Sequence, residues 1–482
     1  MELYNNIASV LSKKGINVTV GSIYDLMSMW KQWYRGSVND FHYYTERING
    51  KDVKCERLTM NMPKKVCEDI TKLLWTEKTK IELSNQNATK KLWEVLDSKE
   101  NSFTVNFPIF LERAVLALGN GATVEYKDEN GKTIIDYIDG DVILPYKYTN
   151  SYINGMIAVS RFVEEMGKKK IYYTHLTYHE FLGDVYIKYN ELYSSKIETE
   201  LGKEIDFTSK FPNVKEKEIV RTVNPYFQIY KPNLANNFDT NSPMGISILA
   251  NSIDRFKALD IKYDSFNNEF VLGKKRIIVA QSAIKGKMET DTEGNTRVVQ
   301  YFDENDKVYQ ALNIDSDNMK EPVKEIDMTL RYQEHIDSIN AELNWASDNM
   351  GLGNNYYKFD GEGVKTATEV ISENSKAFRT REHYLAIVNN AVHDLVKAIC
   401  EIEGIKTNKI IITSDDSIIE DKNAEQLRAQ QEVNAGLKSK KTYLIETKGM
   451  SEEEADAELQ RIADEKMSNQ EAFGIIPSEE WY

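Results

Sequence analysis

One candidate for a chemical site in this chain is the run Gly131, Lys132 and Thr133. A glycine, a lysine and a hydroxyl residue in this order end a phosphate-binding loop, which also needs a glycine five residues earlier, a strand before it and a helix after it. Tyr126 stands where that glycine should be, and alternating apolar and polar residues flank the segment. Asn130-Gly131 between two such runs is the strongest short-range signal for a β-hairpin. We therefore predict a hairpin turn and no nucleotide site.

A second candidate is the pair His175 and His179, which lies beside Glu180. Two histidines four residues apart would share one face of a helix, as they do in helical metal sites. The surrounding tyrosines and threonines alternate, however, which is typical of a strand, and we find no third ligand in the sequence. We predict that the two histidines contribute polar surface on a strand and do not bind a metal.

The remaining reactive residues form no recognisable site. The three cysteines, Cys55, Cys67 and Cys400, are too few and too scattered for a disulfide framework or a zinc site. They suit a reducing compartment, and we predict that each is a small buried apolar residue. Aspartates and glutamates fall on predicted helix faces and in turns, without a spaced cluster of Asp, Glu and His. The sequence therefore predicts no catalytic residue, no cofactor and no metal.

Length and charge narrow the class of protein. The chain has 482 residues, a formal net charge of -15 and 41% hydrophobic residues. This length is typical of about two to four domains with real cores. An acidic surface does not hold nucleic acid tightly, although DNA can still pass such a surface without sticking. The start lacks the apolar core of a signal peptide, and no run of about 18 apolar residues is present, so we expect a soluble protein made in a cytoplasm.

The element that organises the chain is a helix, loop and helix over residues 329–404. The spacing predicts a helix over 329–350, a glycine-rich loop over 351–364 and a very long helix over 365–402 that ends at Gly404. The long helix carries an apolar stripe at three- and four-residue spacing. A helix of this length should cross between domains or pack against copies of itself.

The rest of the chain mixes helices and strands, so the predicted fold class is α+β. We predict helices within 1–50 and over 57–83, 107–118 and 244–272, the last of them ended by Gly273. Strands are expected over 152–235, in a compact strand-rich module at 274–328 and at 409–413. Two charged helices are expected over 421–435 and 451–467, where Ser451 and Glu454 form a capping box.

Three segments carry a resemblance to a known family. They are WKQWYRGSVNDFHYY at 30–44, SPMGISILANSIDRFKALDIKYDSFNNEFVLGKKRIIV at 242–279 and GLGNNYYKFDGEGVKTATEVISENSKAFRT at 351–380. In this order they resemble the portal proteins of tailed bacteriophages, especially the group carried by phages and prophages of Gram-positive bacteria. The resemblance covers most of the chain, although none of the three segments is a catalytic motif.

The resemblance implies a protein that works as an assembly and has no enzymatic activity. Portal proteins form closed rings, usually of twelve subunits, at one vertex of the capsid. Double-stranded DNA is driven through the axial tunnel by the terminase large subunit, and the ring later holds the head–tail adaptor and lets DNA out. The expected partners are therefore other copies of this chain, double-stranded DNA, terminase, the adaptor and capsid or scaffold proteins, with no membrane. The expected location is the virion, after synthesis in the cytoplasm of a host bacterium.

The resemblance also implies a division of the chain into portal regions. The expected regions are the wing at 1–241, the stem helices at 242–272 and 329–350, the clip at 273–328, the tunnel loop at 351–364, the long wing helix at 365–404, and the crown and C-terminal tail at 405–482.

Two groups of residues are expected to be functional on this basis. The centre of the tunnel loop is polar or aromatic with one positive charge, which suits contact with a passing polyanion; its residues are Asn354, Asn355, Tyr356, Tyr357 and Lys358. The basic cluster Lys274, Lys275 and Arg276 either stabilises the C-terminal end of the preceding helix dipole or faces DNA or a partner. Two alternatives stay open at this point: another phage head–neck structural protein, and a metal-dependent enzyme that acts on nucleic acid.

Overall fold

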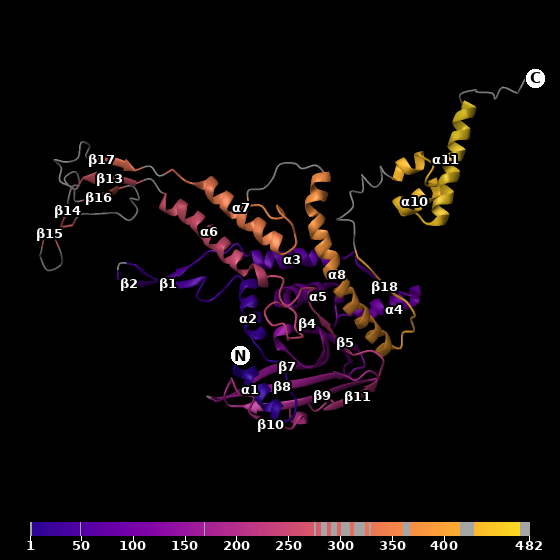
Figure 1. The fold of residues 1–482 in the computed structure, drawn as a ribbon, viewed down its shortest axis with the longest axis horizontal. Coiled ribbons are helices and arrows are strands. Elements are labelled where there is room, and N and C mark those ends of the chain that lie inside the picture. Colours follow the sequence, from indigo (N-terminus) through magenta and orange to yellow (C-terminus); the bar gives the residue numbers. More distant parts are fainter. Residues whose placement is uncertain are drawn as a thin grey trace, which may run out of the picture. The chain divides into compact units, whose positions relative to one another are not determined.

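The computed structural model divides the chain into two compact units. Unit 1 comprises Met1–Val364 and Glu373–Thr413, and unit 2 comprises Lys365–Ser372 and Ser414–Tyr482. The residues that the structure describes are 2–48, 50–167, 169–273, 276–280, 287–290, 296–299, 309–312, 323–326, 329–359, 367–414 and 429–472. They form a mixed helix and sheet fold, as the sequence predicts (Figure 1).

Unit 1 begins with three amphipathic helices. α1 spans Glu2–Lys13 and α2 spans Ile23–Tyr34, whose two tryptophans are buried. α3 spans Met62–Leu74 and carries Pro63 in its first turn, where a missing N–H breaks no hydrogen bond. The predicted helices over 1–50 and 57–83 are therefore only partly right, because both ranges also contain strands.

Those strands are a hairpin and one strand with a distant partner. β1 (Tyr43–Ile48) and β2 (Lys51–Glu56) pair with each other. The sequence between them is Asn49-Gly50, the same signal that predicts the hairpin at Asn130-Gly131. β3 (Lys80–Leu83) pairs with β18 (Ile410–Thr413), which follows the long helix. A four-residue strand whose partner is so far away in sequence leaves no local pattern to detect.

The next helices build a buried aromatic layer. α4 spans Gln86–Leu96, and α5 spans Phe103–Phe110 with Pro108 inside it, followed by a π-helical segment at Leu111–Leu116. The predicted start of this helix at 107 is therefore too late. Its aromatic residues stack on one another, with ring centroids of Phe103 and Phe107 4.7 Å apart.

Two antiparallel sheets form the centre of unit 1. The smaller has the order β12-β4-β5, and its bounds are Gly121–Lys127 for β4, Thr133–Asp139 for β5 and Phe227–Tyr230 for β12. The larger has the order β10-β9-β8-β7-β6, with β11 also paired to β9. Its strands are β6 (Ile143–Thr149), β7 (Tyr152–Met166), β8 (Lys169–Phe181), β9 (Val185–Ser195), β10 (Lys203–Ile205) and β11 (Lys217–Arg221). The predicted hairpin at Asn130-Gly131 is confirmed as the β4–β5 turn, in which Gly131 has a φ of 77°.

The helix predicted over 244–272 starts later than expected. α6 spans Ile253–Leu272 and ends at Gly273 as predicted. The residues before it are buried in a non-helical segment, because their backbone bonds to other parts of the chain: the Gly245 N–H donates to Asn120 Oδ1 (2.7 Å) and the Ile248 N–H donates to the Leu116 carbonyl (3.1 Å). The Ser-Pro signal at 242–243 thus precedes this buried segment and not the helix itself.

The strand-rich module after α6 is confirmed. The described strands are β13 (Arg276–Ala280), β14 (Lys287–Thr290), β15 (Thr296–Val299), β16 (Tyr309–Leu312) and β17 (Val323–Ile326). They form a three-stranded sheet of order β16-β13-β17 and a separate β14–β15 hairpin. α7 (Tyr332–Asn349) follows and matches its prediction closely.

The long helix is present as predicted. α8 spans Ala367–Glu403 and ends just before Gly404, which has a φ of 66°. Its second half is buried against α4, α5 and the neighbouring strands through Leu385, Val388, Val392, Leu395 and Ile399. Arg381, which interrupts the apolar stripe, is also buried, and its Nε donates to the Leu73 carbonyl at 2.7 Å.

Unit 2 is helical in its described part. Residues 429–434 are helical, and α10 (Lys440–Lys448) and α11 (Glu452–Ala472) follow. The predicted capping box is confirmed: the Ser451 N–H donates to Glu454 Oε2 (2.9 Å) and the Glu454 N–H donates to Ser451 Oγ (3.2 Å). The first residues of the helix predicted over 421–435 lie outside the described residues, and α10 was not predicted.

Candidate functional site

The candidate site lies where α6, α7 and the loop after α7 meet. α6 and α7 pack antiparallel, because Arg255 lies beside Trp345 at one end (4.4 Å from guanidinium to ring centroid) and Glu269 lies beside Arg331 at the other. In the middle, Lys262 Nζ bonds to Glu342 Oε1 at 2.7 Å. Figure 1 shows the two helices side by side. We call α6 and α7 the stem pair.

The ion pair between Arg331 and Glu269, at the far end of the stem pair, is bidentate. Arg331 Nε and Nη2 donate to the two oxygens of Glu269 at 3.0 and 2.9 Å. This charge-assisted contact lowers the pKa of Glu269 to about 2. His335 Nε2 also lies 3.7 Å from Glu269 Oε2. The contact therefore ties the first turn of α7 to the last turn of α6.

Much of the apolar surface of the stem pair is exposed in the part of the chain that the structure describes. Phe270 is 48% exposed and Trp345 is 59% exposed. Other large apolar side chains that are exposed on these two helices are Ile261, Val271 and Tyr332. Exposed apolar side chains on two neighbouring helices are typical of a surface that another protein covers.

The loop after α7 folds back along that helix. Its backbone is held by two side chains one turn apart on α7: the Asn355 N–H donates to Asn344 Oδ1 and the Phe359 N–H donates to Asn340 Oδ1, both at 2.8 Å. Gly351 is needed at the start, because its φ is 78° and a Cβ there would lie 2.4 Å from Thr380 Oγ1. The described part of this loop, residues 351–359, is thus docked on the helices.

The five residues predicted to face DNA divide into two groups. Asn354, Asn355 and Lys358 are exposed. Tyr356 and Tyr357 are half-buried against the main core, and the Tyr357 hydroxyl donates to Asp69 Oδ2 of α3 at 2.9 Å. Burial and the Asp69 carboxylate raise the pKa of Tyr357 well above its usual value. The inward position of the tyrosines could not be predicted, since it depends on Asp69, which is far away in the sequence.

The other predicted functional residues lie at the end of α6. Lys274 and Lys275 lie outside the described residues, and Arg276 begins β13. Gly361 and Gly363 of the predicted loop also lie outside the described residues.

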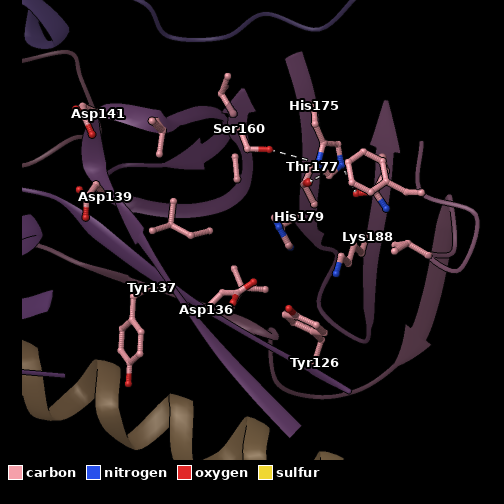
Figure 2. Close-up of a pocket in the computed structure, with 18 of the residues that line it drawn as sticks. Tyr126, Asp136, Tyr137, Asp139, Asp141, Ser160, His175, Thr177, His179 and Lys188 are labelled. Carbon is pink, nitrogen blue, oxygen red and sulfur yellow. Dashed lines mark hydrogen bonds between the residues drawn. The ribbon is translucent and has the colours of Figure 1, made fainter. Parts of the chain in front are cut away.

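The two histidines of the metal hypothesis lie on a strand as predicted, but they are not surface residues. His175 and His179 lie on β8 and line a cavity of about 670 Å³ between the two sheets (Figure 2). His179 is fully buried beside the Tyr186 hydroxyl (2.8 Å), and burial lowers its pKa to about 3. The prediction of polar surface was wrong for His179, because the face of β8 that carries it is covered by β4 and β5.

Ser160 and His175 lie close together in this cavity. The Ser160 Oγ lies 3.4 Å from His175 Nδ1, and His175 Nε2 lies 2.9 Å from Asn190 Oδ1. Ser160 and His175 are register partners on β7 and β8, so their proximity follows from strand pairing. Their distance is longer than the roughly 2.6–3.2 Å typical of a nucleophile and its base. Across the described residues, no group of three His, Cys, Asp or Glu residues could hold a metal ion.

Two further predictions concern cysteines and membranes. Cys67 and Cys400 are buried as predicted, whereas Cys55 is partly exposed on β2, whose other residues are all exposed. Within the described residues, no helix combines the length and apolar character that a membrane span requires.

Comparisons with known proteins test the family resemblance. No curated protein sequence matches the chain. Among solved structures, a chain of the "Virion of native gene transfer agent (GTA) particle" is similar at 11% sequence identity and a TM-score of 0.40; the match covers 80% of this chain and 88% of that one. This structural likeness is too low to support an argument about function.

The comparison with protein families gives the identification. The model of the family described as "Phage portal protein, SPP1 Gp6-like" matches residues 22–472. This range includes α6 and α7, the loop that follows them, α8 and all of the sheets described above. The resemblance to phage portal proteins is therefore confirmed, while an origin in phages of Gram-positive bacteria stays a prediction. The chain belongs to the SPP1 Gp6-like family of phage portal proteins and is a structural component of the virion.

Proposed function

We propose that this chain is the subunit of a closed ring at one capsid vertex, through which double-stranded DNA is packaged and later leaves. In this proposal the ring docks the terminase large subunit during packaging and the head–tail adaptor afterwards. It carries no enzymatic activity of its own. The regions of the chain keep the boundaries given by the resemblance: wing, stem, clip, tunnel loop, long wing helix and crown.

The observation that carries the proposal is the uncovered apolar surface of the stem pair. Ion pairs fix α6 and α7 to each other, yet Phe270, Trp345 and their apolar neighbours remain exposed. A head-to-tail interface repeated by rotation closes into a ring and covers such a surface on every subunit. Family membership supports the same conclusion, because a portal protein works as an assembly.

The exposed side chains of the loop support a role in contact with DNA. Asn354, Asn355 and Lys358 are polar or positive and lie at the surface, whereas the two tyrosines anchor the loop to the body. A single lysine in each subunit would give a ring of positive charge in an assembly whose subunits each carry a formal net charge of -15. Such a ring attracts phosphates without sequence preference, and the acidic remainder limits tight binding.

The first experiment is imaging of the purified full chain by negative-stain electron microscopy, together with analytical ultracentrifugation. We expect rings with a central hole. A compact monomer at high protein concentration, with the stem pair covered by its own chain, would contradict the proposal.

The loop is tested by substitution at Lys358. We expect Lys358→Glu to leave the ring intact and to reduce DNA packaging or DNA retention, because it reverses a ring of charge that faces phosphates. Lys376→Glu is the matched control, since Lys376 is also an exposed lysine near this loop and the substitution makes the same change of charge. Equal packaging by wild type and Lys358→Glu would show that the loop is only a connector.

A further inference from the structure

The β1–β2 hairpin extends away from the other described helices and sheets of unit 1 (Figure 1). Among the described strands, β1 and β2 form a two-stranded sheet of their own. Both faces are open: Tyr43, Thr45, Glu46 and Arg47 are exposed on β1, and every residue of β2 is exposed except Cys55, which is partly exposed. An isolated two-stranded hairpin is only marginally stable in water, and its outer edges present unpaired backbone groups. This hairpin therefore needs a cover that the described residues of the chain do not supply.

The root of the hairpin, by contrast, is firmly fixed to α6. His42 Nε2 lies 3.1 Å from Asp260 Oδ2, and both side chains are only 2% exposed. The other oxygen of Asp260 accepts the Met60 N–H at 2.9 Å, and Asp264 Oδ1 accepts the Leu58 N–H at 3.2 Å. Two carboxylates of α6 thus hold both ends of the hairpin segment.

Arg57 completes this attachment from the hairpin side. Its N–H donates to the His42 carbonyl at 2.8 Å, and its Nη1 donates to the Phe41 carbonyl at 2.5 Å. Its guanidinium also covers the rings of Phe41 and Tyr44 at 4.4 and 4.8 Å. A hairpin fixed in this way extends from unit 1 in a defined direction. We call β1 and β2 together the arm.

The arm has one face that is more apolar than the other. Strand pairing places Tyr44 opposite Cys55, Glu46 opposite Val53 and Ile48 opposite Lys51 on one face, so four of these six residues are apolar. The opposite face carries the cross-strand pairs Tyr43 with Glu56, Thr45 with Lys54 and Arg47 with Asp52, in which Tyr43 alone is a large apolar residue. Val53 is 40% exposed. An antiparallel sheet with one apolar and one polar face normally packs its apolar face on a core, and the described part of this chain places no core there.

We infer that the apolar face of this hairpin arm packs against a neighbouring copy of this chain. The inference rests on the ring proposed above and adds a specific subunit contact to it. One observation favours a second copy over another protein. The arm is rooted on Asp260 and Asp264, and Ile261 between them is exposed on the stem pair, so the arm continues the surface that the ring is proposed to cover.

The three cysteines provide a direct probe of this contact. Cys55 lies on the apolar face of the arm and is partly exposed, whereas Cys67 and Cys400 are buried. Burial also raises the pKa of Cys400 to about 11 and raises that of Cys67, so neither forms the reactive thiolate readily. A maleimide should therefore label Cys55 alone in the folded full-length chain.

The experiment compares maleimide labelling of Cys55 in monomer obtained by dilution and in assembled rings, with the labelled residue identified by mass spectrometry. We expect labelling to slow by about tenfold or more on assembly, as for a group reached only by local opening. Val53→Asp should lower the ring fraction by about tenfold, equivalent to one buried apolar contact replaced by a charge. Thr45→Asp, which adds the same charge to the polar face, should leave the ring fraction unchanged. Thermal unfolding of the monomers checks that both variants fold.

Each other outcome has a distinct meaning. Wild-type rings in which Cys55 reacts at the monomer rate, with Val53→Asp as competent as Thr45→Asp, overturn the inference and leave the proposed ring standing. Protection of Cys55 that appears only after another virion protein is added assigns the arm to that protein and also overturns it. Absence of wild-type rings under every condition overturns the proposed function and the inference together.

Discussion

α8 and α6 are both long helices, but they bury their apolar residues in different ways. The second half of α8, from Tyr384 to Cys400, is buried in the core of its own chain. α6 buries Phe256 and Leu259 in its first half, whereas Phe270 and Val271 at its far end are exposed. The apolar face of the second half of α8 is thus covered by its own chain, whereas the apolar side chains at the far end of α6 are exposed.

The difference shows what an apolar stripe in a sequence can and cannot predict. Both helices carry apolar residues at helical spacing, so the pattern predicts a buried face in each case. It does not say whether the covering surface comes from the same chain or from a second one. For the second half of α8 the cover includes the aromatic layer of α4 and α5, and for the far half of α6 it consists of α7 and Phe359 of the loop after α7 among the described residues. We expect α8 to determine the stability of the monomer and α6 to determine its assembly.

The largest expected effect is therefore the loss of a buried side chain from α8. Leu395→Ala should lower the free energy of unfolding of the monomer by about 2–5 kcal/mol, because the fully buried Leu395 would leave a cavity. Urea unfolding followed by circular dichroism measures this change. Leu437→Ala is the matched control at a residue that is 83% exposed, and we expect a change of no more than about 0.5 kcal/mol. Equal stabilities of the two variants would break the proposed contrast between α8 and α6.

A second effect concerns a carboxyl group buried in the same self-contained region. Glu125 lies opposite Ile135 of the core that α8 completes, and it accepts a hydrogen bond from the Thr123 hydroxyl at 2.7 Å. Burial raises the pKa of Glu125 to about 8. Above the unfolded-state pKa of about 4.5 the unfolded chain loses this proton while the folded chain keeps it, so stability falls as the pH rises from about 4.5 to about 8.

Glu125→Gln should remove this loss and stabilise the monomer at pH 7 by an amount on the order of 1–3 kcal/mol. Urea unfolding of wild type and variant at several pH values measures the difference. We expect the difference to grow between about pH 4.5 and 8. A difference that stays constant over this range would mean that Glu125 ionises normally in the folded protein.

Local signals were the part of this fold that the sequence could predict well. The capping box at Ser451 and Glu454 and the turn at Asn130-Gly131 depend only on residues close in sequence, and both were predicted correctly. The hairpin at Asn49-Gly50 carried the same signal and was missed, because the aromatic residues around it were assigned to a helix.

Contacts between distant residues account for most of what the sequence did not predict. β3 is a strand because Ile81 pairs with Ile412, and α6 begins late because Gly245 and Ile248 bond to Asn120 and Leu116. In the candidate site, the composition of the loop correctly suggested a polar surface for Asn354, Asn355 and Lys358. It gave no sign that two tyrosines turn inward, and whether the exposed residues meet DNA stays a prediction.

The third prediction tests the uncovered surface of α6. Phe270→Ala should change monomer stability by no more than about 0.5 kcal/mol, because Phe270 is about half exposed, but it should lower the ring fraction severalfold. Sedimentation velocity measures the ring fraction, and urea unfolding measures monomer stability. Phe238→Ala is the control, since Phe238 is a similarly exposed phenylalanine outside the stem pair. If Phe270→Ala destabilised the monomer and left the rings unchanged, α6 would resemble α8.

The smallest effect concerns the ion pair that joins the two stem helices. Arg331 holds the pKa of Glu269 at about 2, below its ordinary value of about 4.5. The contact therefore stabilises the native pairing fully above about pH 4.5 and is lost as the pH falls from there through about 2. Because the pair is solvent-exposed, salt should weaken it.

We expect faster amide hydrogen exchange in the first turn of α7 as the pH falls through this window, after correction for the intrinsic pH dependence of exchange. Glu269→Gln should show the faster exchange already at neutral pH and lose the additional change in acid. The amides around Leu395 should exchange slowly throughout, because buried apolar side chains hold this part of α8 in its core. If acid loosened both regions equally, the response would be global unfolding, and the stem pair would have no separate stability of its own.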